Sequence, residues 1–168
     1  MTAPTDDRAL LRHTLATLAY RAEKVLRDPP PGFAELRIGP ASRTPVAIVG
    51  HLGDLLEWGR SMADGRSDWK PGGTGDWDAD VERFFAALKS FDERLSLATP
   101  LGHPASVLFQ GPIADSFTHV GQLALLRGHA GSSVRPESYA RAEIASGRIG
   151  REQSANRREF DGDASARR

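Results

Sequence analysis

Four stretches of the chain carry apolar side chains at helical spacing, and this repeated pattern constrains the fold more than any other feature. Apolar residues that recur every three to four positions line one face of an α-helix. The four predicted helices cover residues 5–28, 44–64, 78–98 and 105–129, with an irregularity expected at Gly111-Pro112 in the last. No alternating pattern typical of strands competes with them. The sequence therefore predicts an all-α fold, a four-helix bundle with a short extra C-terminal helix over residues 136–146.

Composition narrows the classes of function. The 168 residues contain 22 basic and 22 acidic side chains, so no net charge points to nucleic acid or to an anionic membrane as partner. The absence of cysteine excludes disulfides, thiolate metal sites and cysteine nucleophiles. The opening residues lack the pattern of a signal peptide, and no apolar run reaches the ~20 residues of a membrane span. We expect a cytoplasmic protein, with residues 1–150 forming the bundle and residues 151–168 a polar tail, partly disordered or laid on the surface.

The last predicted helix is apolar on almost every side, yet it contains three polar residues in a row. Because a helix turns about 100° per residue, Asp115, His119 and Gln122 fall on one line along its surface. Leu108 and Leu126 extend that line at either end. The row lies opposite the strongest apolar side of the helix, so we expect it to be partly exposed, as at a cleft.

The second predicted helix carries another histidine within its apolar face. Thr44 is a suitable N-cap and Pro45 a suitable first helical residue. His51 falls in the middle of the face and is predicted to point inward. The face itself is made by apolar residues at helical spacing: Ile48, Leu52, Leu55, Trp58 and Met62.

The three tryptophans lie in or beside this part of the chain. Trp58 fits the core, and the alternative is that it lines a pocket. Trp69 and Trp77 belong to a Gly- and Asp-rich loop after the second helix, where exposure would be costly. We expect them to cover either the core or the mouth of a pocket.

His51, Asp115 and His119 form a candidate metal site. The i, i+4 spacing lets Asp115 and His119 share one ion, and His51 would approach from the facing helix. Imidazole with carboxylate suits Zn, Ni, Fe or Mn, and three protein ligands leave positions open for water or substrate. Such an ion could lower the pKa of a bound water or thiol. Gln122 could orient a ligand, and Asp54 could do the same or bind directly.

Spacing alone leaves structural alternatives open. His51 is equally well explained as a core histidine that makes one hydrogen bond. Asp115 and His119 are also explained as a simple pair on one helix surface. The sequence assigns no catalytic acid, base or nucleophile.

Several segments together resemble one family. TPVAIVGHLGDLLEW resembles the second helix of DinB-like proteins, in which a histidine follows a Thr-Pro helix start and a tryptophan comes later. DWDADVERFFAALKSFDERL is similar to their third helix, and DSFTHVGQLALLRGHAG to their fourth, with its H-x-G-Q core. The resemblance covers most of residues 8–153. It implies a four-helix bundle that holds a divalent metal through a histidine triad, often as a homodimer.

The chain departs from the family pattern at one ligand position, and the resemblance also implies a kind of activity. His51 matches the second-helix ligand and His119 the second histidine of the fourth helix, whereas Asp115 stands where the first is expected. Related enzymes include S-transferases and isomerases that use mycothiol, bacillithiol or glutathione. The first hypothesis is therefore a divalent-metal-dependent enzyme with a small-molecule substrate, a thiol-dependent S-transferase or a hydrolase. The second is a non-catalytic binding or stress-associated bundle with a vestigial site, which Asp115 in place of histidine motivates.

Overall fold

A computed structural model describes residues 5–160, and within that range the chain is helical with no strand beyond one isolated bridge. The four long helices are α1 (Thr5–Leu26), α2 (Pro45–Ala63), α3 (Trp77–Ser96) and α5 (Ala114–His129). The short elements are η1 (Phe33–Glu35), α4 (Ala105–Leu108), η2 (Phe109–Ile113) and η3 (Tyr139–Arg141). The prediction of an all-α chain with four long helices is confirmed.

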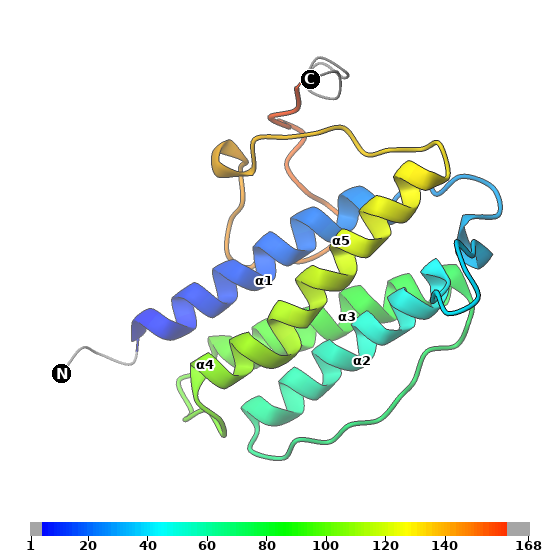
Figure 1. Ribbon diagram of the computed structural model, residues 1–168. Coiled ribbons are helices and arrows are strands. Elements are labelled where there is room, and N and C mark those ends of the chain that lie inside the picture. The colour runs from blue at the N-terminus through cyan, green and yellow to red at the C-terminus, as the bar shows by residue number, and fades with distance from the viewer. Residues whose placement is uncertain (1–4, 161–168) are drawn as a thin grey trace.

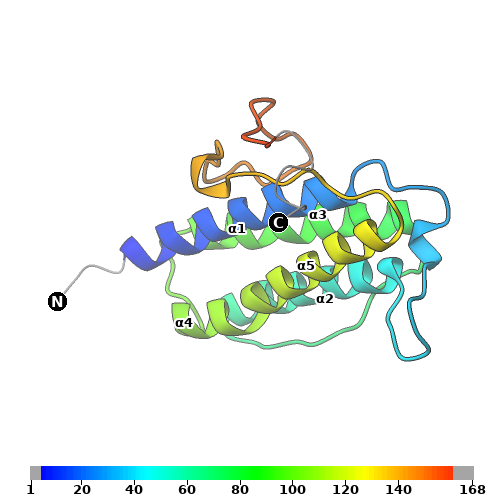
Figure 2. The same cartoon turned by 45° about the horizontal axis from the view of Figure 1, so that its top comes forward.

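The long helices pack side by side as a bundle in which α2 and α5 form one layer and α1 and α3 the other (Figure 1). Contacts join α2 to α3 and α5, and join α1 to the same two helices. After the view is turned, α4 and α5 still follow one line, and η3 lies beyond α1 (Figure 2). The predicted metal ligands, His51 on α2 with Asp115 and His119 on α5, thus all belong to one layer. We call these three residues the triad.

Local sequence explains where the helices begin and end. The Thr44 hydroxyl accepts a hydrogen bond from the Ala47 amide at 3.3 Å, so Thr44 caps α2 as predicted. Asp76 caps α3 in the same way. Gly131 follows α5 with φ 70°, and the Ser132 amide donates to the Arg127 carbonyl at 2.9 Å. Both features belong to a Schellman ending, which needs a left-handed residue at that position.

The core fills the space between the two layers. Its largest side chains are fully buried and come from α1, α2, α3, the α4–η2 segment and η1: Leu15, Leu18, Phe33, Leu52, Leu56, Phe84, Leu88, Phe91, Leu95, Leu108 and Ile113. Each such side chain contributes about 1.5–3 kcal/mol relative to exposure. This apolar interior holds α2 against α5, which is the condition for any site shared between them.

Residues 66–76 connect α2 to α3 by running back along α2. The hydroxyl of Ser67 accepts from the indole of Trp58, and the Gly72 amide donates to Asp54 at 2.8 Å. A methyl group on Gly50 would lie 2.9 Å from the Gly73 Cα, so the two backbones touch. Because the connection returns to the level of Gly50 before α3 begins, α2 and α3 run in the same direction (Figure 1).

The predicted helix over residues 136–146 is wrong. Only three residues, Tyr139–Arg141, form a 3₁₀ turn there. The reason is tertiary: the Glu137 carboxylate is drawn under α1, where Tyr20 and Lys24 donate hydrogen bonds to it. A helix would carry that side chain on a solvated surface, whereas the buried pair with Lys24 fixes an extended course.

Residues 151–160 follow the surface and are tied to α1 by ion pairs. Arg157 pairs with Glu23, and Glu159 pairs with Lys24 at 2.9 Å. Residues 161–168, the rest of the predicted tail, lie outside the described residues. No helix in the described range has the length and apolar character needed to cross a membrane.

Candidate metal centre

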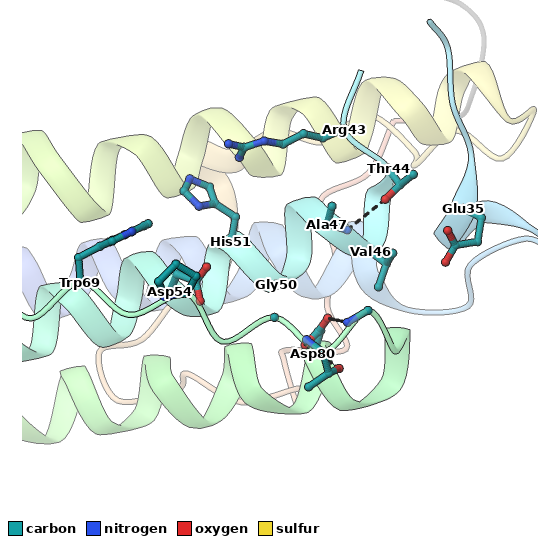
Figure 3. A pocket seen from close by; sticks show the side chains of 14 residues that line it. Glu35, Arg43, Thr44, Val46, Ala47, Gly50, His51, Asp54, Trp69 and Asp80 are labelled. Carbon is teal, nitrogen blue, oxygen red and sulfur yellow. Dashed lines mark hydrogen bonds between the residues drawn. The ribbon is translucent and has the colours of Figure 1, made fainter. Parts of the chain in front are cut away.

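His51 is held on α2 by close packing on two sides of that helix. Gly50 touches Gly73 of the 66–76 connection, and Arg83 of α3 donates to the Gly50 carbonyl at 3.1 Å. These contacts fix the helix immediately beside His51. The imidazole then points away from α3, toward α5 and the Trp69 indole (Figure 3).

A π-helical turn before α5 determines the direction in which Asp115 and His119 project from that helix. η2 inserts this turn at Phe109–Ile113, around Pro112, where the sequence predicts an irregularity. Proline has no amide hydrogen, so it removes one helical hydrogen bond and favours such a break. The Ser116 hydroxyl donates to the Pro112 carbonyl at 2.7 Å and closes the turn. α5 starts directly afterwards, with Asp115 in its first turn.

The three side chains meet in space. His51 Nε2 lies 3.8 Å from one oxygen of Asp115, and His119 Nε2 lies 3.5 Å from the other. One ligand atom from each residue falls within 4.8 Å of the others. A tetrahedral ion with bonds of ~2.0–2.1 Å has ligand atoms ~3.4 Å apart. The group therefore could hold a metal ion after small side-chain rotations.

Gln122 gives His119 a defined tautomer. Its side-chain oxygen lies 2.8 Å from His119 Nδ1, so that nitrogen carries the hydrogen and donates it. The lone pair of Nε2 then faces Asp115 and the centre of the group. Such an outer hydrogen bond orients a metal-binding imidazole and raises its basicity. Gln122 therefore contacts His119 directly, and its orienting role stays a prediction.

The environment of His51 favours its neutral, metal-binding form. Burial lowers the pKa of the His51 imidazole, and the nearby His119 and Arg43 lower it further. The carboxylates of Asp115 and Asp54 act in the opposite direction without prevailing. The rings of His51 and His119 are 4.7 Å apart and perpendicular. The imidazole of His51, on the α2 side of the group, is therefore favoured in the form whose lone pair can bind an ion.

Exposure differs across the group. The side chains of His51 and His119 are 19% and 11% exposed, whereas that of Asp115 is 47% exposed. The two imidazoles are thus half-enclosed and the carboxylate borders solvent. A ligand entering from solvent would meet Asp115 first.

Asp54 is placed away from the group. Its carboxylate accepts from Arg83 at 2.7 Å and from the Gly72 amide at 2.8 Å. It therefore holds the 66–76 connection and α3 against α2. It influences His51 through charge and makes no contact with the triad.

One of the three tryptophans packs in the core, and the other two lie beside the triad. Trp77 packs edge-on against Phe33, with ring centres 5.6 Å apart. Trp69 packs edge-on against His51 at 5.7 Å and against Trp58 at 5.8 Å. Trp58, half-buried, lines a hollow beside Asp115. Two tryptophans thus form a wall on one side of the triad.

Two hollows meet at His51. One, of about 700 Å³, lies over the start of α2 and the 66–76 connection. The other, of about 560 Å³, lies between the residue 38–43 segment and α5, and contains all three triad residues with Gln122. Arg43 lines both hollows, and Figure 3 shows its guanidinium pointing toward the His51 ring. The candidate centre is therefore open to a small molecule.

Fold and site together define a class: a helical bundle whose α2 and α5 share a His–Asp–His group able to hold a divalent ion. No protein-family model matches the chain, and no match was found among curated proteins or solved structures. The DinB-like resemblance therefore stays a prediction.

Sequence reasoning missed Arg43 and did not place Trp69 specifically on His51. Arg43 lies at the end of a loop, where no periodicity indicates a direction. Its position just before the Thr44 cap, two helical turns ahead of His51, was the available signal. The edge-on contact of Trp69 with His51 depends on the return path of a loop, which local pattern does not encode.

Proposed function

We propose that this protein is a divalent-metal-dependent enzyme whose His51, Asp115 and His119 hold the ion, as in the DinB-like proteins that its helices resemble. The convergence of the three ligand atoms from α2 and α5 carries the proposal. In the proposed reaction class, a water or a low-molecular-weight thiol attacks a small-molecule substrate, giving hydrolysis or S-transfer. The homodimer implied by the resemblance and the cytoplasmic location expected from the sequence belong to this same proposal.

The ion would supply one effect: it would bring the pKa of a coordinated water or thiol toward neutrality. The chain's own residues do the rest. His51 and His119 offer their Nε2 atoms, Asp115 offers a charge that partly balances the ion, and Gln122 accepts a hydrogen bond from the other nitrogen of His119. Three protein ligands leave at least one position free, which distinguishes this arrangement from a closed structural site.

Trp69 and Trp58 contribute by shielding. The Trp69 ring packs against His51 and the Trp58 ring packs against Trp69, so the two rings exclude water from one edge of the His51 imidazole. A lower local dielectric strengthens the interactions of a charged nucleophile with its surroundings. The open α5 side leaves room for substrate.

Metal content is the first test. Protein purified without chelators or added metal is expected to contain Zn, Ni, Fe or Mn at about one ion per chain by elemental mass spectrometry. His51→Ala and His119→Ala are expected to lose it. His13→Ala, which removes an exposed histidine of α1, serves as matched control and should retain it.

The same preparations decide between the two hypotheses from the sequence. Stoichiometric metal that is lost in His51→Ala would justify a screen of thiol-transfer and hydrolysis substrates with that ion. Protein that stays metal-free after incubation with each candidate ion would contradict the enzyme proposal and favour a binding bundle with a vestigial site.

A further inference from the structure

One cation beside the triad is not neutralised by any acid in the described range. Arg43 makes no hydrogen bond and no ion pair with residues 5–160. Arg83, on the other side of α2, is held by both Asp54 and Glu57. An arginine without a partner carries five donors that remain free for a ligand. Because Arg43 lines both hollows at His51, those donors face the candidate site.

The backbone on each side of Arg43 is ordered by local hydrogen bonds. The Ser42 hydroxyl accepts from the Ile38 and Gly39 amides, each at 3.2 Å, and donates to the Gly39 carbonyl at 2.8 Å. On the other side Thr44 caps α2. The root of Arg43 is thus fixed between a turn and a helix start. Binding at its guanidinium would therefore order the side chain without also ordering the backbone that carries it.

The charged side chains that line the α5-side hollow balance each other. Asp115 is the single acid among the residues that line it, and Arg43 cancels its charge. With the divalent ion of the proposed function in place, the hollow becomes net positive. A cleft with one sign of charge concentrates ligands of the opposite sign.

The same hollow has an apolar rim. Ile38 and Leu125 both line it, and they are 49% and 70% exposed. Ile48 and Leu126 form apolar parts of its floor. Apolar side chains at the rim of a hollow give the aliphatic part of a ligand a surface to cover. The hollow therefore combines one anion-binding group with an apolar wall.

We propose that this hollow binds a small organic acid, with Arg43 paired to its carboxylate and Ile38 and Leu125 covering its aliphatic chain. The planar guanidinium matches a carboxylate through two parallel hydrogen bonds. As a statement about substrate class the inference rests on the proposed function, whereas the binding itself requires no metal. The pairing would hold the acid beside His51, with the body of the molecule against α5.

Calorimetric titration with hexanoate tests the inference on metal-free protein and on protein loaded with Zn. Hexanoate is expected to bind more tightly than acetate, which lacks the chain, and than hexan-1-ol, which lacks the charge. Arg43→Ala should weaken hexanoate binding ~10-fold or more, because a charge-assisted pair is lost. Arg43→Lys should fall between the two, since it keeps the charge without the fork.

Arg141→Ala is the matched control. Arg141 lies in η3 and lines neither hollow, and its side chain makes no described hydrogen bond or ion pair. Its removal changes net charge equally and should leave hexanoate affinity unchanged. Because Arg43 is exposed, both variants should keep the melting temperature of the parent.

Three results would overturn the inference: no measurable hexanoate binding, equal affinity in the parent and Arg43→Ala, or inorganic phosphate bound as tightly as hexanoate. Metal content, measured on the same samples, distinguishes failure of the acid-binding inference from failure of the proposed metal-dependent function. Arg43→Ala should keep its metal and lose hexanoate affinity, whereas the metal-free parent should still bind hexanoate.

Discussion

At the scale of single residues, the His119–Gln122 pair determines how well the group can bind an ion. The hydrogen bond at 2.8 Å fixes which imidazole nitrogen faces Asp115. Gln122→Ala removes the acceptor, and we expect the affinity for Zn to fall ~10–100-fold, the usual cost of losing such an orienting partner. Competition with a chromogenic chelator measures it. Gln122→Glu retains an acceptor and should restore affinity; equal affinity in Gln122→Ala would exclude an orienting role.

At the scale of secondary-structure elements, the contact between α2 and η2 sets the spacing of the triad. A methyl group on Gly59 would lie 2.7 Å from the Phe91 ring and 3.0 Å from Pro112. Both neighbours are rigid and buried, so Gly59→Ala must push the π-helical turn away from α2. We expect the free energy of unfolding to fall by about 1–3 kcal/mol, measured by urea denaturation, with weaker metal binding.

The control for that variant is Gly121→Ala on the exposed side of α5. A methyl group there meets nothing within 4 Å. Alanine in a helix interior is favoured over glycine, so this variant should gain about 0.5–1 kcal/mol and keep its metal affinity. If Gly59→Ala behaved like Gly121→Ala, close packing at η2 would not govern the triad.

At the scale of the whole molecule, a buried ionic network ties the C-terminal segment to α1. Burial raises the pKa of the Glu137 carboxyl, but hydrogen bonds from Lys24, Tyr20 and the Arg158 amide outweigh it and leave the pKa below its usual range. A carboxyl with a lowered pKa in the folded state adds stability above its unfolded pKa, near 4.3. That contribution disappears as the pH falls through the lower, folded value.

Glu137→Gln should therefore destabilise the protein most at pH 7. We expect a loss of about 2 kcal/mol in the free energy of unfolding, because Lys24 keeps its second partner Glu159 at 2.9 Å. The difference from the parent should narrow as the pH drops below about 4.3. Urea denaturation across that range measures both. Glu152→Gln, at an exposed position, should change stability by less than ~0.5 kcal/mol at any pH; a pH-independent effect of Glu137→Gln would contradict the ionic explanation.

Much of this molecule follows from local sequence. Helical periodicity predicted the four long helices, the Thr44 cap predicted the start of α2, and Pro112 predicted the break before α5. The same periodicity placed Asp115, His119 and Gln122 on one line of α5. These features are local because they depend on spacing, capping and missing amide hydrogens, which act within a few residues.

The tertiary structure decided the rest. It brought His51 close to Asp115 and His119 of α5, and it paired Asp54 with Arg83. It also packed Trp69 edge-on against His51 and placed Arg43 in the lining of the hollows. It also replaced the predicted helix at residues 136–146 with an extended segment, because Glu137 is more stable beneath α1 than on a helix surface. Such outcomes depend on contacts between residues far apart in the chain, whose energies no local pattern contains. The sequence by itself determined which side chains each helix presents, and packing of the helices determined which of them meet.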